Sequence, residues 1–226
     1  MNNPIRECFE LSTRKAMKVN QYFDIYLRHF KKLKKKASPK NKIRFLEIGI
    51  WNGGSIEMWQ KYFGKDNIEL HMMDINPACK SLETQEVTIY IGDQANKTFL
   101  EGIVSKTSKF DVILDDGGHT MEQQLNSFDV LYSHVKPGGY YICEDLHTSY
   151  WQEYGGGYLK AGTFIEFAKN KIDALNAYHS RDNRLLIDDF AKSCYCIHAY
   201  GSIIFFEKSL GEIKKSHDVL CGYLEV

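Results

Sequence analysis

The 226-residue sequence lacks several features that would direct a protein to particular compartments or partners. It has no apolar run long enough for a transmembrane helix, and residues 1–7 contain no apolar stretch of the secretory-signal type. It also lacks net charge, because 29 basic residues balance 29 acidic ones, so the charge balance gives no reason to expect nucleic-acid binding. These absences predict a protein with no membrane span and no nucleic-acid partner.

Paired cysteines of the C-x-x-C type are absent as well. The six cysteines are scattered along the chain: Cys8, Cys79, Cys143, Cys194, Cys196 and Cys221. Scattered cysteines are typical of small buried apolar residues in a reducing compartment. The sequence therefore predicts a cytoplasmic location.

The first forty residues have the pattern of a helical extension. In residues 5–36 apolar side chains recur at steps of three and four, which predicts one or two amphipathic helices. The stretch ends in a lysine run followed by Pro39, a combination typical of a helix C-terminus. Attraction to an anionic membrane surface or to an anionic substrate such as a nucleotide sugar is the alternative interpretation of the lysines. We expect residues 1–40 to precede a single domain over 41–226.

From residue 43 onward, short apolar runs alternate with helical stretches near 54–63, 95–105, 120–135 and 163–178. The alternation predicts an α/β fold, a doubly wound and mainly parallel sheet with helices on both faces. Tyr200 and Gly201 fit a tight antiparallel turn between the last two strands. Ligands of such folds bind beyond the carboxyl ends of the strands. The predicted strands cover residues 43–50, 68–74, 87–92, 110–116, 140–144, 194–199 and 202–207.

A glycine-rich turn follows the first predicted strand, and its details exclude two common nucleotide sites. The dinucleotide fingerprint G-x-G-x-x-G needs a second glycine where this chain has Trp51. A P-loop needs a lysine directly before Ser55, where this chain has Gly54. The turn therefore favours a cofactor without phosphates.

Acids on three strand ends fit a cofactor with a cationic amino-acid portion. Glu47 can accept hydrogen bonds from an α-ammonium group, Asp74 can accept both hydroxyls of a ribose, and Asp93 is placed near an adenine. Taken singly, Asp74 could cap the next segment and Glu47 could be a solvated charge. In register they resemble the E-x-G…D…G-D-Q spacing of class I S-adenosylmethionine-dependent methyltransferases. The predicted cofactor-binding residues are Glu47, Gly49, Gly53, Ser55, Asp74, Asp93, Gln94 and Asp115.

A second acidic cluster follows the fourth and fifth strands. Asp116 ends one strand, and Glu144 and Asp145 end the next, so neighbouring strands would bring these carboxylates into one pocket. Crowded carboxylates repel one another, and a divalent cation removes that penalty. All-oxygen ligands favour Mg²⁺, with Mn²⁺ or Ca²⁺ as alternatives. We expect Asp116, Glu144 and Asp145 to be metal ligands and Asp115 to face the cofactor or its helix terminus.

His119 lies three residues after Asp116 and is the predicted general base. The ordinary pKa of a histidine, near 6.5, suits proton removal around neutral pH. His147 is a weaker second candidate, because a polar residue on the substrate rim explains it equally well.

The run from Ile113 to His119, followed by Lys136 to Trp151, resembles the metal-dependent sugar O-methyltransferases of macrolide biosynthesis, of mycinamicin and tylosin type, and related enzymes of bacterial surface polysaccharides. The resemblance covers roughly residues 20–180 and implies a Rossmann-like seven-stranded sheet. It implies metal ligation by Asp116, Glu144 and Asp145, His119 as base, and a cofactor site at Glu47, Gly49, Asp74 and Asp93. Gly118 departs from the serine common in relatives.

The predicted activity is therefore transfer of a methyl group from S-adenosylmethionine to a hydroxyl of a sugar or nucleotide-linked sugar, in a possible homo-oligomer. Chelation does not distinguish a sugar diol from a catechol, so a catechol-type acceptor stays open. A metal-assisted oxygenase or hydrolase on the same fold, and a non-catalytic cofactor-binding protein, stay open as well. Trp151, Tyr154 and Tyr158 beside Gly155–Gly157 suggest a lid over the acceptor.

Overall fold

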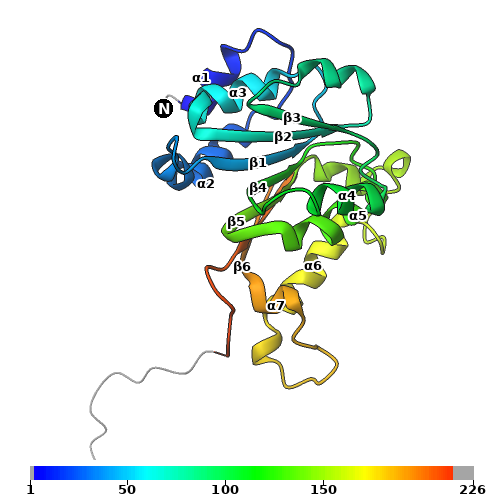
Figure 1. Cartoon of the computed structure of the whole chain (residues 1–226). Helices are drawn as coiled ribbons and strands as arrows, with labels where there is room; N and C mark the ends of the chain where they lie inside the picture. The colour runs from blue at the N-terminus through cyan, green and yellow to red at the C-terminus, as the bar shows by residue number, and fades with distance from the viewer. Residues whose placement is uncertain (1–2, 216–226) are drawn as a thin grey trace, which may run out of the picture.

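The computed structural model describes residues 3–215, so Cys221 lies outside the described part of the chain. A seven-stranded sheet forms its centre, with the strand order β3-β2-β1-β4-β5-β7-β6 (Figure 1). The strands from β3 to β5 are parallel, and β7 runs antiparallel between β5 and β6. This confirms the doubly wound, mainly parallel sheet. The strands are β1 (Ile43–Ile48), β2 (Ile68–Asp74), β3 (Val87–Ile91), β4 (Phe110–Asp115), β5 (Val135–Cys143), β6 (Cys194–Tyr200) and β7 (Ile203–Lys208).

Helices cover both faces of the sheet and bury a separate apolar cluster on each. One cluster joins α1 (Pro4–Glu10), α2 (Tyr22–Lys36) and α3 (Gly54–Phe63) to the sheet. The other joins α4 (Lys97–Val104), α5 (Met121–Leu131), α6 (Phe164–Leu175) and α7 (Asp189–Ser193) to the opposite face. Short 3₁₀ turns complete the chain at Lys65–Asn67, Pro77–Leu82, Tyr132–His134, Leu146–Tyr150, Gln152–Tyr154 and Ala177–His179.

The strand residues alternate between these two clusters, as a sheet buried on both faces requires. In β1, Phe45 packs in the cluster of α1–α3, whereas Leu46 and Ile48 pack in the cluster of α4–α7. Trp59 of α3 is fully buried, and its ring centroid lies 4.9 Å from that of Phe45. This packing fixes the first strand and its carboxyl end relative to α3.

The N-terminal region forms two helices with an irregular segment between them. Asn3 caps α1 by accepting hydrogen bonds from the backbone of Ile5 and Arg6, and Pro4 occupies the first turn. Residues 11–21 then run without regular structure as far as α2, apart from a turn at the helix start. Both helices contribute to the core of the sheet, and a domain boundary between residues 40 and 41 stays a prediction.

The C-terminal hairpin was predicted, but two other details were not. β6 and β7 pair antiparallel across Gly201 and Ser202, which confirms the hairpin, but its turn lies one residue after the predicted Tyr200 and Gly201 because Tyr200 pairs with Ile203. β5 begins at Val135, five residues before the predicted start at residue 140, because Val135 pairs with Phe110 before a register shift. The short helix α7 was missed. No helix among residues 3–215 is long and apolar enough to cross a membrane.

Candidate active site

A cavity of about 580 Å³ lies beyond the carboxyl ends of the parallel strands, which is an ordinary size for a small-molecule site. Eight of the predicted site residues line it: Gly49, Ser55, Asp74, Asp93, Gln94, Asp116, His119 and Asp145. Among residues 3–215, four other predicted site residues do not line the cavity: Glu47, Gly53, Asp115 and Glu144. The sequence therefore predicted where the cavity lies, whereas these four residues are not part of its lining.

The glycine-rich turn after β1 is held against the end of β4. Gly49 has a φ of +94°, and a Cβ atom built there would lie 2.1 Å from the carbonyl oxygen of Asp116. One carboxylate oxygen of Asp74 accepts hydrogen bonds from the backbone amides of Ile50, at 2.8 Å, and Trp51, at 3.2 Å. Asp74 thus shapes the turn, and its contact with a ribose stays a prediction.

Asp115 and Gln94 fix the turn that carries His119. Asp115 is fully buried, and its Oδ1 accepts a hydrogen bond from Nε2 of Gln94 at 3.0 Å. Gln94 in turn accepts one from the backbone amide of Gly118 at 2.8 Å. Burial raises the pKa of Asp115 to about 7. Asp115 therefore supports the turn from inside the protein, and its predicted contact with the cofactor stays a prediction.

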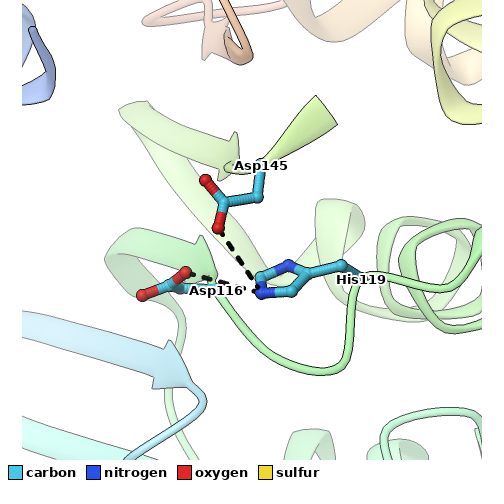
Figure 2. A group of neighbouring side chains, drawn as sticks. All are labelled: Asp116, His119 and Asp145. Atoms are coloured by element: carbon cyan, nitrogen blue, oxygen red, sulfur yellow. Dashed lines mark ion pairs between the residues drawn. The ribbon is translucent and has the colours of Figure 1, made fainter. Parts of the chain in front are cut away.

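Asp116, His119 and Asp145 all line the cavity. Figure 2 shows their side chains pointing toward one another. Nε2 of His119 lies 3.9 Å from Oδ1 of Asp116 and 3.6 Å from Oδ2 of Asp145. One ligand atom from each residue lies within 4.8 Å of the others, close enough to share a cation. His119 and Asp145 have φ of 60° and 53°, a left-handed conformation that is uncommon for residues other than glycine. Strained residues of this kind cluster at functional sites.

The acidic cluster also holds a lysine that sequence reasoning missed. Lys18 extends from residues 11–21 and places Nζ 2.6 Å from Oδ2 of Asp116, 3.1 Å from Oε2 of Glu144 and 3.4 Å from Oε1 of Glu47. Its side chain is 1% exposed. Burial acts to lower the pKa of Lys18, but attraction to the three carboxylates outweighs it and raises that pKa well above its ordinary value. Lys18 therefore supplies the ammonium partner of the three carboxylates.

Glu144 and Glu47 are the two buried carboxylates that contact this lysine. Glu144 receives hydrogen bonds from Lys18 on one carboxylate oxygen and from the hydroxyl of Tyr26 on the other. Burial raises the pKa of Glu144 to about 7, although Lys18 acts in the opposite direction. Glu47 accepts a hydrogen bond from Nε1 of Trp59 at 2.9 Å. Metal ligation by Glu144 stays a prediction, and it requires exchange of Lys18 or Tyr26 for the ion.

Aromatic side chains of α2 and of the segment after β5 contact Asp145 and His147. The hydroxyl of Tyr22 lies 2.9 Å from Oδ1 of Asp145. His147 is bonded to Ser202 at 2.6 Å and packs its ring on Trp151, which is 44% exposed. His147 therefore has a structural partner, whereas the buried Nδ1 atom of His119, on a side chain that is 19% exposed, has no hydrogen-bond partner among residues 3–215.

The chain is similar to known methyltransferases. Residues 46–146 match a family model described as a methyltransferase domain. The demethylmacrocin O-methyltransferase of Streptomyces fradiae is 31% identical over 82% of this chain and 48% of its own length. The mycinamicin VI 2''-O-methyltransferase of Micromonospora griseorubida is 33% identical over 81% of this chain and 47% of its own length. The chain thus spans about half the length of these curated relatives.

A solved structure of similar fold is the MycE methyltransferase of the mycinamycin pathway in complex with Mg, SAH and mycinamycin VI. It superposes with a TM-score of 0.78 and 27% identity over 92% of this chain and 53% of that one. Its fold confirms the Rossmann-like methyltransferase sheet expected from the sequence. Residues 46–146 are therefore a methyltransferase domain, and the chain is similar to the demethylmacrocin and mycinamicin VI O-methyltransferases over about half of their length.

Proposed function

We propose that the protein is a divalent-metal-dependent O-methyltransferase that transfers a methyl group from S-adenosylmethionine to a sugar hydroxyl. One observation carries the proposal: Asp116, His119 and Asp145 meet at the end of the same cavity whose other walls hold Gly49 and Asp93. The relatives that act on macrolide and tetracenomycin glycosides support a sugar acceptor. A base and an acidic pair beside a cofactor cavity are what this reaction needs.

The residues present fit a hard divalent cation. Asp116 and Asp145 offer carboxylate oxygens in the group of atoms, shared with His119, that lie within 4.8 Å of one another, and Asp116 already pairs with the ammonium of Lys18. Carboxylate oxygens are the ligands that Mg²⁺ prefers, which leaves the imidazole of His119 free to act as the base. Bound there, Mg²⁺ would make a coordinated hydroxyl easier to deprotonate. Asp116 and Asp145 would hold the ion directly, and Glu144 is proposed to belong to the same site.

His119 is proposed to remove the acceptor proton. Its Nε2 faces the end of the cavity, and the positive charge that it gains is stabilised by Asp116 and Asp145 on either side. Thr148 holds the backbone carbonyl of His119 by a hydrogen bond of 3.0 Å, which keeps the turn in place. The chain's own contribution is therefore to position the base and to bring the acceptor oxygen in line with the methyl group.

The acceptor is proposed to be a sugar, free or nucleotide-linked, bound between Asp145 and the exposed aromatic ring of Trp151. A role in surface-polysaccharide or glycoside biosynthesis would follow. We also propose a cytoplasmic location, supported by the free thiols of the five described cysteines. A homo-oligomer is consistent with the proposal.

Labelled S-adenosylmethionine incubated with a panel of nucleotide sugars and diols tests the activity. We expect EDTA to abolish labelling and Mg²⁺ or Mn²⁺ to restore it. His119→Ala should lose about 100-fold or more of the turnover rate while SAH binding, measured by calorimetry, stays at the wild-type level. His147→Ala is the comparison variant, for which a smaller loss is expected. Full turnover in His119→Ala, or activity that ignores chelation, contradicts the proposed mechanism.

A further inference from the structure

The irregular segment over residues 11–21, here called the N-terminal strap, crosses the start of α3. Thr13 donates to Glu57 from its backbone amide at 2.6 Å and from its hydroxyl at 2.7 Å. Ser12 donates to the carbonyl of Gly54 at 3.2 Å. Beyond these contacts the strap lines the cavity and carries Lys18 into the acidic cluster. The strap is therefore held at both ends.

Lys18 places one ammonium group among three carboxylates that come from three different strand ends. Its three N–H donors match the three acceptors on Glu47, Asp116 and Glu144, all within 3.4 Å of Nζ. The side chains of Lys18, Glu47 and Glu144 are each 1% exposed. Buried charges of this kind need a fixed partner, because water does not solvate them.

The lysine divides the carboxylate of Asp116 between two environments. Oδ2 faces Lys18 at 2.6 Å, whereas Oδ1 faces His119 at 3.9 Å. Glu144 is held on the lysine side by Lys18 and Tyr26 together. The atoms that lie near one another outside these contacts are Oδ1 of Asp116, Oδ2 of Asp145 and Nε2 of His119, and all three residues line the cavity.

We propose that Lys18 is a positioning residue for methyl transfer. Its ammonium occupies the part of the acidic cluster that is formed by Glu47, Glu144 and Oδ2 of Asp116. A single divalent cation then binds at the other part, formed by Oδ1 of Asp116 and by Asp145, beside His119. The inference rests on the proposed function, and it adds a role for the strap. The alternative is that Lys18 merely fastens the strap to the sheet.

Removing the lysine charge separates these two roles. Lys18→Met takes away the neighbouring positive charge and frees Glu144 and Oδ2 of Asp116. We expect Mn²⁺, titrated into the substrate-free protein and followed by the electron paramagnetic resonance of free Mn²⁺, to bind at least about tenfold more tightly. Turnover at saturating Mn²⁺ should fall at least about tenfold, because the ion then sits away from the position that suits His119. A merely structural lysine would weaken metal binding and turnover together.

Two further variants complete the test. Lys18→Arg keeps the charge and should leave Mn²⁺ affinity near that of the wild type. Thr13→Ala loosens the strap at its other end without changing any charge, and it should weaken SAH binding while Mn²⁺ affinity is unchanged. If circular dichroism shows that Lys18→Met does not fold, Lys18→Gln replaces it, because the amide can still donate hydrogen bonds.

The outcomes distinguish this inference from the proposed function. A wild-type protein that binds neither Mn²⁺ nor SAH overturns both. A wild-type protein that binds both, with unchanged or weaker Mn²⁺ binding in a folded neutral variant of Lys18, overturns the positioning role alone. Tighter Mn²⁺ binding combined with slower turnover supports it.

Discussion

Replacement of Gly49 by alanine tests how closely the cofactor turn and the metal end of the cavity are joined. The new Cβ would lie 2.1 Å from the carbonyl oxygen of Asp116, so that oxygen must move by about 1.3 Å to reach the 3.4 Å at which ordinary contact begins. The φ of +94° adds the steric cost of a left-handed residue with a side chain, about 1–2 kcal/mol. The clash falls on the backbone that carries Asp116, whereas the strain of the left-handed conformation falls on the turn at residue 49.

We expect Gly49→Ala to lower the free energy of unfolding by about 2–4 kcal/mol and to weaken SAH binding, since strain in the turn and the clash with backbone add. A displacement of this size at Asp116 should also cost about 100-fold in turnover. Urea unfolding measures the stability effect, and calorimetric titration of SAH measures the binding effect. Gly102→Ala is the matched control, because no atom lies within 4 Å of its added Cβ, and in a helix it should be neutral or stabilise by up to about 1 kcal/mol. Wild-type stability and SAH affinity in Gly49→Ala would refute the reasoning.

Two other predictions concern buried polar groups. Burial lowers the pKa of His29, which stacks on Phe205, from 6.5 to about 4, so the unfolded chain binds its proton first as the pH falls. His29 should therefore contribute about 3 kcal/mol of unfolding free energy above pH 6.5 that is lost toward pH 4, at about 1.4 kcal/mol per pH unit. Urea titrations should show it as a change of that size in the difference between wild type and His29→Gln, because Asp115 and Glu144 titrate alike in both proteins. A difference that stays constant from pH 6.5 to pH 4 contradicts it. Trp59→Phe removes the hydrogen bond to the buried Glu47 and should cost about 2–3 kcal/mol in the same assay, whereas a loss below about 0.5 kcal/mol would show that this bond contributes little.

The strands of the parallel sheet were predictable because each is a short apolar run that ends in polar residues. Since parallel strands end at one edge, Asp74, Asp93 and Asp116 could be placed at the same cavity from the sequence alone. What the sequence could not show is which acids face the cavity. Glu47 and Glu144 have the same strand-end position and the same charge as the others, yet both are buried behind the wall.

Lys18 was missed for a different reason. Residues 5–36 were interpreted from their apolar spacing, and a lysine in a polar stretch is normally solvent-exposed. The signal available was the interval between Phe9 and Val19, where Ser12 and Thr13 stand in place of regularly spaced apolar residues. That interval marks a break between helices, but burial of the lysine depends on carboxylates far away in the sequence.

Those long separations have a consequence for the order of folding. Lys18 meets Asp116 and Glu144, which follow it by 98 and 126 residues. Contacts over such distances are costly to form in a loose chain, so the ion cluster cannot nucleate the fold. During synthesis, the strap must wait until the fifth strand has emerged and joined the sheet. Completion of the active site is therefore expected among the last steps of folding, after the apolar clusters have formed.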